Sequence, residues 1–181
     1  MRTLLKYCLI VLVSLLPAIS HAADPFPAEQ TFAGQTLTLN GKGTRTKAVF
    51  HLYDAGLYLP AKNQDAKAIL TTEQPMAMRL VITSGMITSE NMTEAVRDGF
   101  KQAGASAALQ PRIDQLINVF KSKIQKGDVY DFVYTPTTIT IIKNGADAAT
   151  ITGSDFKQTF FGLWLGDHPV QESLKKALLG A

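Results

Sequence analysis

The sequence predicts an α+β domain in which helices pack against one antiparallel sheet. Segments that alternate polar and apolar residues, or that are mostly apolar, come first along the chain. Two segments with apolar residues every three or four positions follow, as in amphipathic helices. Three short strand-like segments joined by turn signals come next, and two further helical segments end the chain. Strands that follow one another through tight turns pair antiparallel, so this order favours a sheet covered by helices.

The first strands are predicted between residues 36 and 83. Residues 36–39 alternate in polarity, which is typical of a half-buried strand, and Asn40-Gly41 after them signals a tight turn. Residues 49–59 are mostly apolar or aromatic and predict a strand buried on both faces, with Gly56 as a kink or a point of close approach. Residues 78–83 predict another strand.

A three-stranded meander is predicted from residues 128–135, 138–143 and 148–152. Its first pair of strands turns through Pro136. Its second pair turns through Asn144-Gly145, a strong short-range hairpin signal.

Two amphipathic helices are predicted before the meander, over residues 88–103 and 109–124. Thr88 or Ser89 is the expected cap of the first helix. The second helix ends in a group of lysines before Gly127, and these positive charges complement the negative end of a helix. The alternative interpretation of this group is a binding patch. That group consists of Lys121, Lys123 and Lys126.

Two helices are predicted after the meander. Ser154 is expected to cap the first, which Gly166 stops. The second is expected to run from Pro169, since proline is favoured at the first helical position, to Leu179.

Residues 1–22 predict a secretory signal peptide. Arg2 and Lys6 precede an apolar run, and small residues favour cleavage after Ala22. The apolar run is shorter than the about 20 residues that a membrane anchor needs, so no stable membrane insertion is expected after cleavage. A periplasmic or secreted location follows. Residues 23–31 predict a flexible lead-in, and residues 32–181 predict one domain.

The composition of the mature chain excludes several classes of function. Its only cysteine, Cys8, leaves with the signal, so neither disulfides nor thiol chemistry is expected. Loss of Arg2 and Lys6 from the 18 basic residues leaves 16 against 15 acidic ones. This near neutrality argues against nucleic acid as a partner. The sequence has no phosphate-binding loop or nucleotide fingerprint, so no cofactor is predicted.

Two stretches of the sequence carry a resemblance to a known family. The first is Gly41-Lys-Gly-Thr-Arg45 leading into Tyr53-Asp-Ala-Gly56-Leu-Tyr58-Leu, and the second is Trp164-Leu-Gly166-Asp167-His-Pro169. Together they resemble the chalcone isomerase-like family in its bacterial exported branch, from about residue 32 to residue 180. The resemblance implies an open-faced β-sandwich, in which a large antiparallel sheet is backed by helices and a ligand cleft lies between them.

The resemblance also implies site residues. The family's arginine corresponds to Arg45, and a tyrosine expected near the next strand in its fatty-acid-binding branch corresponds to Tyr53. His51 lies two residues from Tyr53 and is therefore expected on the same strand face. The plant enzymes carry a tyrosine and, seven residues on, an asparagine; Thr88 and Ala95 stand at these positions. Thr88 keeps a hydroxyl, whereas Ala95 offers no hydrogen bond, so the full catalytic set is not visible.

The predicted function is therefore binding of a fatty acid or a similar apolar carboxylate, with Arg45, Tyr53, Thr88 and His51 as the ligand-binding residues. The alternative is an isomerase that acts on a chalcone-like enone as an intramolecular lyase. A further alternative is a haem-binding member of the fold, with His51 or His168 as the iron ligand. Two separated histidines do not form a metal cluster, so no other metal is predicted. The partner is an apolar small molecule with an acidic group, and no oligomeric state follows from the sequence.

Overall fold

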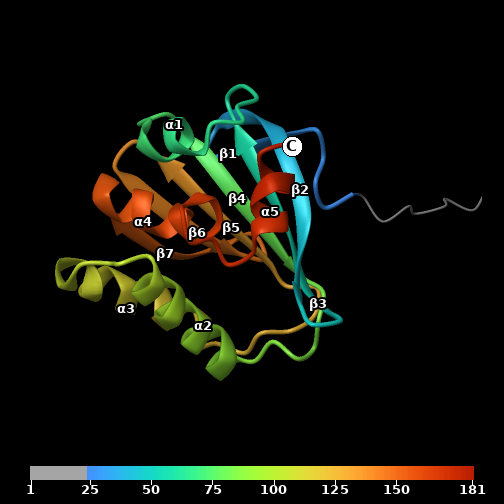
Figure 1. Cartoon of the computed structure of the whole chain (residues 1–181), viewed down its shortest axis with the longest axis vertical. Helices are drawn as coiled ribbons and strands as arrows, with labels where there is room; N and C mark the ends of the chain where they lie inside the picture. The colour runs from blue at the N-terminus through green and yellow to red at the C-terminus, as the bar shows by residue number, and fades with distance from the viewer. Residues whose placement is uncertain (1–23) are drawn as a thin grey trace, which may run out of the picture.

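The structure, a computed structural model, describes residues 24–181 and contains one seven-stranded sheet. Every pair of neighbouring strands is antiparallel, and the strands lie in the sheet in their chain order, so the sheet is a simple meander (Figure 1). The predicted signal peptide lies outside the described residues. The strands are β1 (Glu29–Phe32), β2 (Gln35–Lys47), β3 (Phe50–Leu59), β4 (Met76–Ile82), β5 (Val129–Thr135), β6 (Thr138–Lys143) and β7 (Ala146–Thr152).

The helices gather on one face of the curved sheet (Figure 1). One short helix joins β3 to β4, a pair of helices joins β4 to β5, and two helices follow β7. Among the described residues, none of the helices combines the length and the apolar character needed to cross a membrane. The helices are α1 (Ala66–Thr71), α2 (Ser89–Gln102), the 3₁₀ turn η1 (Ala107–Leu109), α3 (Gln110–Phe120), α4 (Ser154–Leu165) and α5 (Glu172–Leu178).

Alternation along the central strands divides the core into two layers. On β4, Met76, Met78, Leu80 and Ile82 belong to the large cluster between the sheet and the helices, whereas Ala77 belongs to a smaller cluster on the other face. Successive side chains of a strand point to opposite faces, so the central strands can be apolar on both. The sheet is therefore buried on its helix face and partly covered on the other.

Local sequence signals explain several elements as predicted. The β6–β7 hairpin turns through Asn144 and Gly145, both at positive φ, as the Asn-Gly pair predicts. Thr88 caps α2, and its hydroxyl accepts from the N–H of Asn91 while the Asn91 side chain accepts from the N–H of Thr88. A Cβ on Gly56 would lie 2.5 Å from the ring of Phe26, so this glycine is a point of close approach, as predicted.

Several predicted boundaries differ from the structure. Asn40-Gly41 is not a turn, because β2 continues through it with a bulge between Leu39 and Gly41. Gly153 rather than Ser154 is the N-cap of α4, and no side chain caps that end. Pro169 lies outside α5, which begins at Glu172 with Gln171 as its N-cap.

The N-terminal segment and α1 are the largest differences from the sequence prediction. Residues 23–31 were expected to form a flexible lead-in, but Glu29–Phe32 forms β1 and Phe26 is buried against β3. Helix α1 has only six residues, too few for an amphipathic pattern to appear. Its last carbonyls are bound by the fully buried Lys157 of α4, whose Nζ donates to Ile69 O at 2.8 Å and to Leu70 O at 2.9 Å.

Helix α5 lies close against β2, which positions one side of the functional cleft. A Cβ on Gly41 would lie 2.1 Å from the carbonyl oxygen of Ala177, so only glycine allows this approach. Asn40, the extra residue of the bulge, donates from its amide to the carbonyls of Asn63 and Leu178 at 2.9 and 2.8 Å. These contacts fix the C-terminal end of α5 on the sheet.

Candidate functional site

An apolar cleft of about 400 Å³ lies between the sheet and the helices α2 and α4. This volume falls in the range of roughly 300 to 1,000 Å³ that small-molecule sites occupy. Most of its lining is aliphatic or aromatic, and a few polar side chains stand at one side. The lining residues are Arg45, Lys47, Leu52, Tyr53, Leu80, Met86, Ile87, Asn91, Met92, Ala95, Val96, Gly99, Phe120, Phe132, Phe160, Leu163, Trp164 and Val170.

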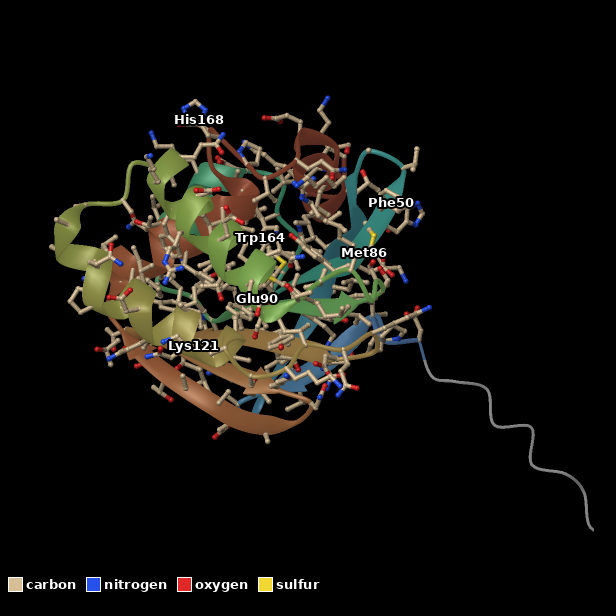
Figure 2. The ribbon with its side chains drawn as sticks, turned by 90° about the horizontal axis from the view of Figure 1, so that it is seen from below. Phe50, Met86, Glu90, Lys121, Trp164 and His168 are labelled. Atoms are coloured by element: carbon tan, nitrogen blue, oxygen red, sulfur yellow. The ribbon has the colours of Figure 1, made fainter. Side chains whose placement is uncertain are left out.

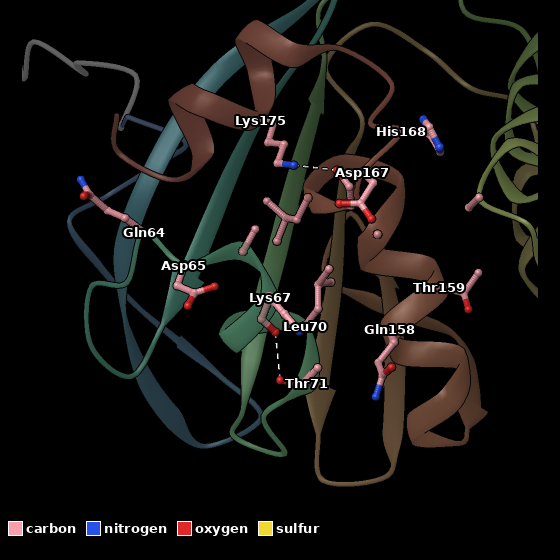
Figure 3. A pocket seen from close by; sticks show the side chains of 15 residues that line it. Gln64, Asp65, Lys67, Leu70, Thr71, Gln158, Thr159, Asp167, His168 and Lys175 are labelled. Carbon is pink, nitrogen blue, oxygen red and sulfur yellow. Dashed lines mark hydrogen bonds between the residues drawn. The ribbon is translucent and has the colours of Figure 1, made fainter.

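A second groove, of about 850 Å³, is larger but polar and open (Figure 3). It runs between α1 and α4, near the start of α5. Its side chains are engaged locally: Lys175 Nζ donates to Gly166 O at 2.7 Å, and Asp65 accepts from the N–H of Ala68 at 3.0 Å as the cap of α1. Within residues 24–181, no group of histidine, cysteine, aspartate and glutamate is arranged to hold a metal ion. The apolar cleft is therefore the candidate site.

Arg45 stands at the polar side of the cleft with part of its guanidinium uncommitted. Its Nη1 donates to Gln171 Oε1 at 3.0 Å and to the carbonyl of Thr46. Its Nε and Nη2 have no hydrogen-bond partner among the described residues. An arginine fork of this kind matches the two oxygens of a carboxylate.

Gln171 orients Arg45 and is a site residue that the sequence analysis missed. Besides the bond to Arg45, its Oε1 accepts from the backbone N–H of Thr46 at 2.9 Å. Its Nε2 donates to Ser173 Oγ at 2.6 Å. As the N-cap of α5, Gln171 joins that helix to β2 beside the cleft. The contact spans more than a hundred residues of sequence, so no local pattern indicates it.

Tyr53 is the second polar residue of the cleft. It lies directly opposite Arg45 in the β2–β3 ladder and is 8% exposed. Trp164 Nε1 donates to the Tyr53 hydroxyl oxygen at 3.1 Å. The Tyr53 O–H has no acceptor among the described residues and remains a donor. Burial raises the pKa of this phenol, and the Trp164 hydrogen bond and the nearby Arg45 offset that rise only in part, so the proton is retained at neutral pH.

A bulge in β3 decides which neighbours of Tyr53 reach the cleft. Arg45 pairs with Tyr53 and Thr46 pairs with His51, so Leu52 is the extra residue. Two residues on the bulged strand then oppose one on its partner, and the simple alternation is lost. Leu52 lines the cleft beside Tyr53, whereas His51 is exposed and does not line it. The expectation that His51 shares the face of Tyr53 is therefore wrong.

The other predicted site residues also lie away from the cleft lining. Thr88 is exposed, and its hydroxyl serves as the cap of α2. His168 is exposed and lines the polar groove (Figure 3). With His51 outside as well, neither described histidine lines the apolar cleft in which a haem would be placed.

Helix α2 contributes an apolar wall to the cleft. Ala95, Val96 and Gly99 line the cleft and offer it no side-chain donor. Asn91 also lines it, but its Nδ2 donates to Met86 O at 2.7 Å and its Oδ1 accepts from the N–H of Thr88 at 2.9 Å. Polar contacts from the protein are thus concentrated on the β2–β3 side.

The fold and the cleft define the class: an α+β protein with a helix-backed antiparallel sheet and a ligand-sized apolar space between the two layers. The chain matches the chalcone isomerase-like family over residues 20–180 and belongs to that family. The predicted fold class and family are thereby confirmed.

One solved structure of this fold is the crystal structure of a fatty-acid binding protein from Arabidopsis thaliana. It aligns with a TM-score of 0.69 and 17% identity, and the alignment covers 85% of this chain and 90% of that chain. At this identity the likeness shows the fold alone. No curated protein matches the sequence.

Proposed function

We propose that this protein binds a fatty acid or a similar apolar carboxylate in the cleft between the sheet and the helices. The Arabidopsis structure supports this, since it is a fatty-acid binding protein of the same fold. The observation that carries the proposal is that two neighbouring residues at an apolar cleft have uncommitted donor groups. These are the Nε and Nη2 groups of Arg45 and the O–H of Tyr53.

The chemistry of the two donors suits a carboxylate. A guanidinium edge binds both oxygens of a carboxylate, and the phenol adds a third hydrogen bond to the same group. Each bond to a charged group contributes about 1.5 to 3 kcal/mol. The aliphatic part of the ligand lies against the aromatic and aliphatic residues of the cleft, at about 0.8 kcal/mol for each buried methylene.

Binding is favoured over turnover by the apolar wall of α2. An isomerase that acts on a chalcone-like enone needs donors on both sides of its substrate to hold the phenolate and the developing enolate. Ala95 leaves one such position without a donor, and the Asn91 side chain is engaged at the start of the helix. Arg45 and Tyr53 together suffice for one carboxylate.

The test compares a free acid with its methyl ester. Titration calorimetry with a saturated fatty acid should show binding to the wild type, and native mass spectrometry should show acyl chains that co-purify. Arg45→Ala removes both hydrogen bonds of the guanidinium edge. It should therefore weaken binding of the acid by at least about 10- to 150-fold, the equivalent of one charged hydrogen bond, and should weaken binding of the ester much less.

The matched control for this experiment is Arg97→Ala. Arg97 is exposed on α2 and does not line the cleft, so its removal changes the net charge of the protein equally. Affinity for the acid should stay at the wild-type value. If acid and ester lose equal affinity in Arg45→Ala, the guanidinium does not bind a carboxylate and the proposal fails.

We further propose, from the pattern of residues 1–22, that the protein acts outside the cytoplasm after signal cleavage. The basic start, the apolar run and the small residues before Ala23 support this. N-terminal sequencing of protein isolated from cells should begin at Ala23. Recovery of the protein with its original N-terminus would contradict the proposal.

A further inference from the structure

The exposed large hydrophobic side chains of residues 24–181 gather at one end of the molecule. They are Val49, which is 84% exposed, Phe50, which is 52% exposed, and Met86, which is 46% exposed. Phe50 and Met86 lie toward the same end in Figure 2, away from His168. A cluster of exposed apolar residues on an otherwise polar surface marks an interaction site more often than isolated ones do.

The folding of the hairpin does not explain this apolar tip. Ala48 and Val49 form the two-residue turn between β2 and β3, and Ala48 has a φ of 53°. Glycine and asparagine adopt positive φ at lower cost and are favoured in such turns, as at Asn144 and Gly145 in the β6–β7 hairpin. Turn formation therefore does not favour the pair Ala48-Val49 at the β2–β3 tip.

The apolar tip is continuous with the rim of the cleft. The N–H groups of Thr83 and Ser84 donate to the carbonyl of Leu52 at 3.0 and 3.2 Å, which holds the loop before α2 against β3. Met86 of that loop and Lys47 of the hairpin both line the cleft. A ligand that passes between this loop and the hairpin passes beside the exposed side chains.

The size and charge of the patch favour a lipid surface over a protein partner. A stable protein interface buries on the order of 800 Å² on each partner, from 20 to 30 residues. Two exposed apolar side chains on the hairpin and one on the neighbouring loop do not provide this area. Apolar side chains beside a basic residue suit an anionic bilayer, where the first enter the headgroup region and the second meets lipid phosphate. Lys47 is exposed and forms no ion pair with a described residue.

We propose that the β2–β3 tip and the loop before α2 dock on anionic lipid membranes, and that the cleft exchanges its ligand there. The docking itself stands on the residues of the tip, whereas the exchange of ligand rests on the proposed function. A long-chain acid is poorly soluble in water, and a docked rim gives it a path from the bilayer into the cleft without crossing bulk solvent.

Vesicle flotation tests the docking. Mature protein is mixed with vesicles of phosphatidylcholine alone, or of phosphatidylcholine with phosphatidylglycerol. Wild-type protein should float with the anionic vesicles and much less with the neutral ones. The double variant Val49→Ser/Phe50→Ser should lose on the order of tenfold in partitioning, because two exposed apolar side chains no longer enter the bilayer. Lys47→Gln should lose about fivefold, and Lys67→Gln, an exposed lysine in the polar groove, should lose nothing.

A solution binding assay separates this proposal from the proposed function. Val49 and Phe50 do not line the cleft, so the double variant should bind a short, water-soluble acid with wild-type affinity while it extracts a fluorescent long-chain acid from vesicles more slowly. Equal flotation of the wild type and the double variant overturns the docking. A wild-type dimer in the absence of lipid that the double variant abolishes also overturns it, in favour of a second copy. Flotation without binding of any acid leaves the docking standing and overturns the proposed function.

Discussion

Replacing Tyr53 with phenylalanine separates two tasks of one hydroxyl group. In the folded protein the oxygen accepts from Trp164 Nε1 at 3.1 Å, and the proton is available to a ligand. The substitution keeps the aromatic ring in the core and removes only this oxygen. Stability should therefore report the first task, and ligand affinity should report the second.

The effect on stability follows from the buried indole. Tyr53→Phe leaves the Trp164 N–H without an acceptor, which costs about 1 to 3 kcal/mol in the free energy of unfolding. Trp164→Phe removes the donor as well. The loss of stability in the double variant should then be smaller than the sum of the losses in the two single variants. The difference, which is the coupling energy between the two side chains, should be about 1 kcal/mol, as expected for side chains in contact.

The effect on binding differs between a free acid and its methyl ester. Loss of one hydrogen bond to a carboxylate, worth about 1.5 to 3 kcal/mol, predicts a 10- to 150-fold weaker affinity for the acid. The ester accepts only a neutral hydrogen bond, so its affinity should fall by about 2- to 10-fold. Denaturant unfolding and titration calorimetry near neutral pH measure the two effects. An equal loss for acid and ester would refute a carboxylate at Tyr53, and a double-mutant cycle with no coupling would refute the bond to Trp164.

Four further predictions concern the cleft and its supports. For saturated acids of increasing length, the affinity measured by calorimetry should rise about fourfold with each methylene until the cleft of about 400 Å³ is filled. An affinity independent of length would show that the acyl chain does not bind in the cleft. Lys157→Met should cost about 3 kcal/mol of unfolding free energy without changing acid affinity, since it removes the donor to the carbonyls of α1 and lies outside the cleft. Burial lowers the pKa of Lys157 from 10.5 to about 8, so between pH 8 and pH 10.5 the unfolded chain binds more protons than the folded protein. In this pH range the unfolding free energy of the wild type should rise with pH relative to that of Lys157→Met. A fall would contradict the assignment. Gly41→Ala should destabilise the protein by about 1 to 3 kcal/mol, because the added Cβ forces α5 away from β2. It should also weaken acid binding, because α5 carries Gln171 with it. Unchanged stability in denaturant unfolding would show that the contact between Gly41 and α5 is loose.

Local sequence signals predicted the elements that are decided locally. The Asn144-Gly145 hairpin, the cap at Thr88 and the strand centred on Gly56 each follow from neighbours in the sequence. Asn40-Gly41 misled the prediction because Asn40 makes its amide bonds to Asn63 and Leu178, and these tertiary contacts stabilise a bulge where the dipeptide alone favours a turn. The four-residue strand β1 gave no periodic pattern long enough to detect.

For the candidate site, the residue pattern predicted Arg45 and Tyr53, through their place in the family motif, and the apolar character of the helices that face them. The tertiary structure alone decided how these donors are used. Gln171 and Trp164 reach Arg45 and Tyr53 across more than a hundred residues, and the β3 bulge turns Leu52 into the cleft while it leaves His51 outside. The physical reason is that periodicity and turn propensity are short-range properties, whereas the engagement of a hydrogen-bonding group depends on which distant segment packs against it.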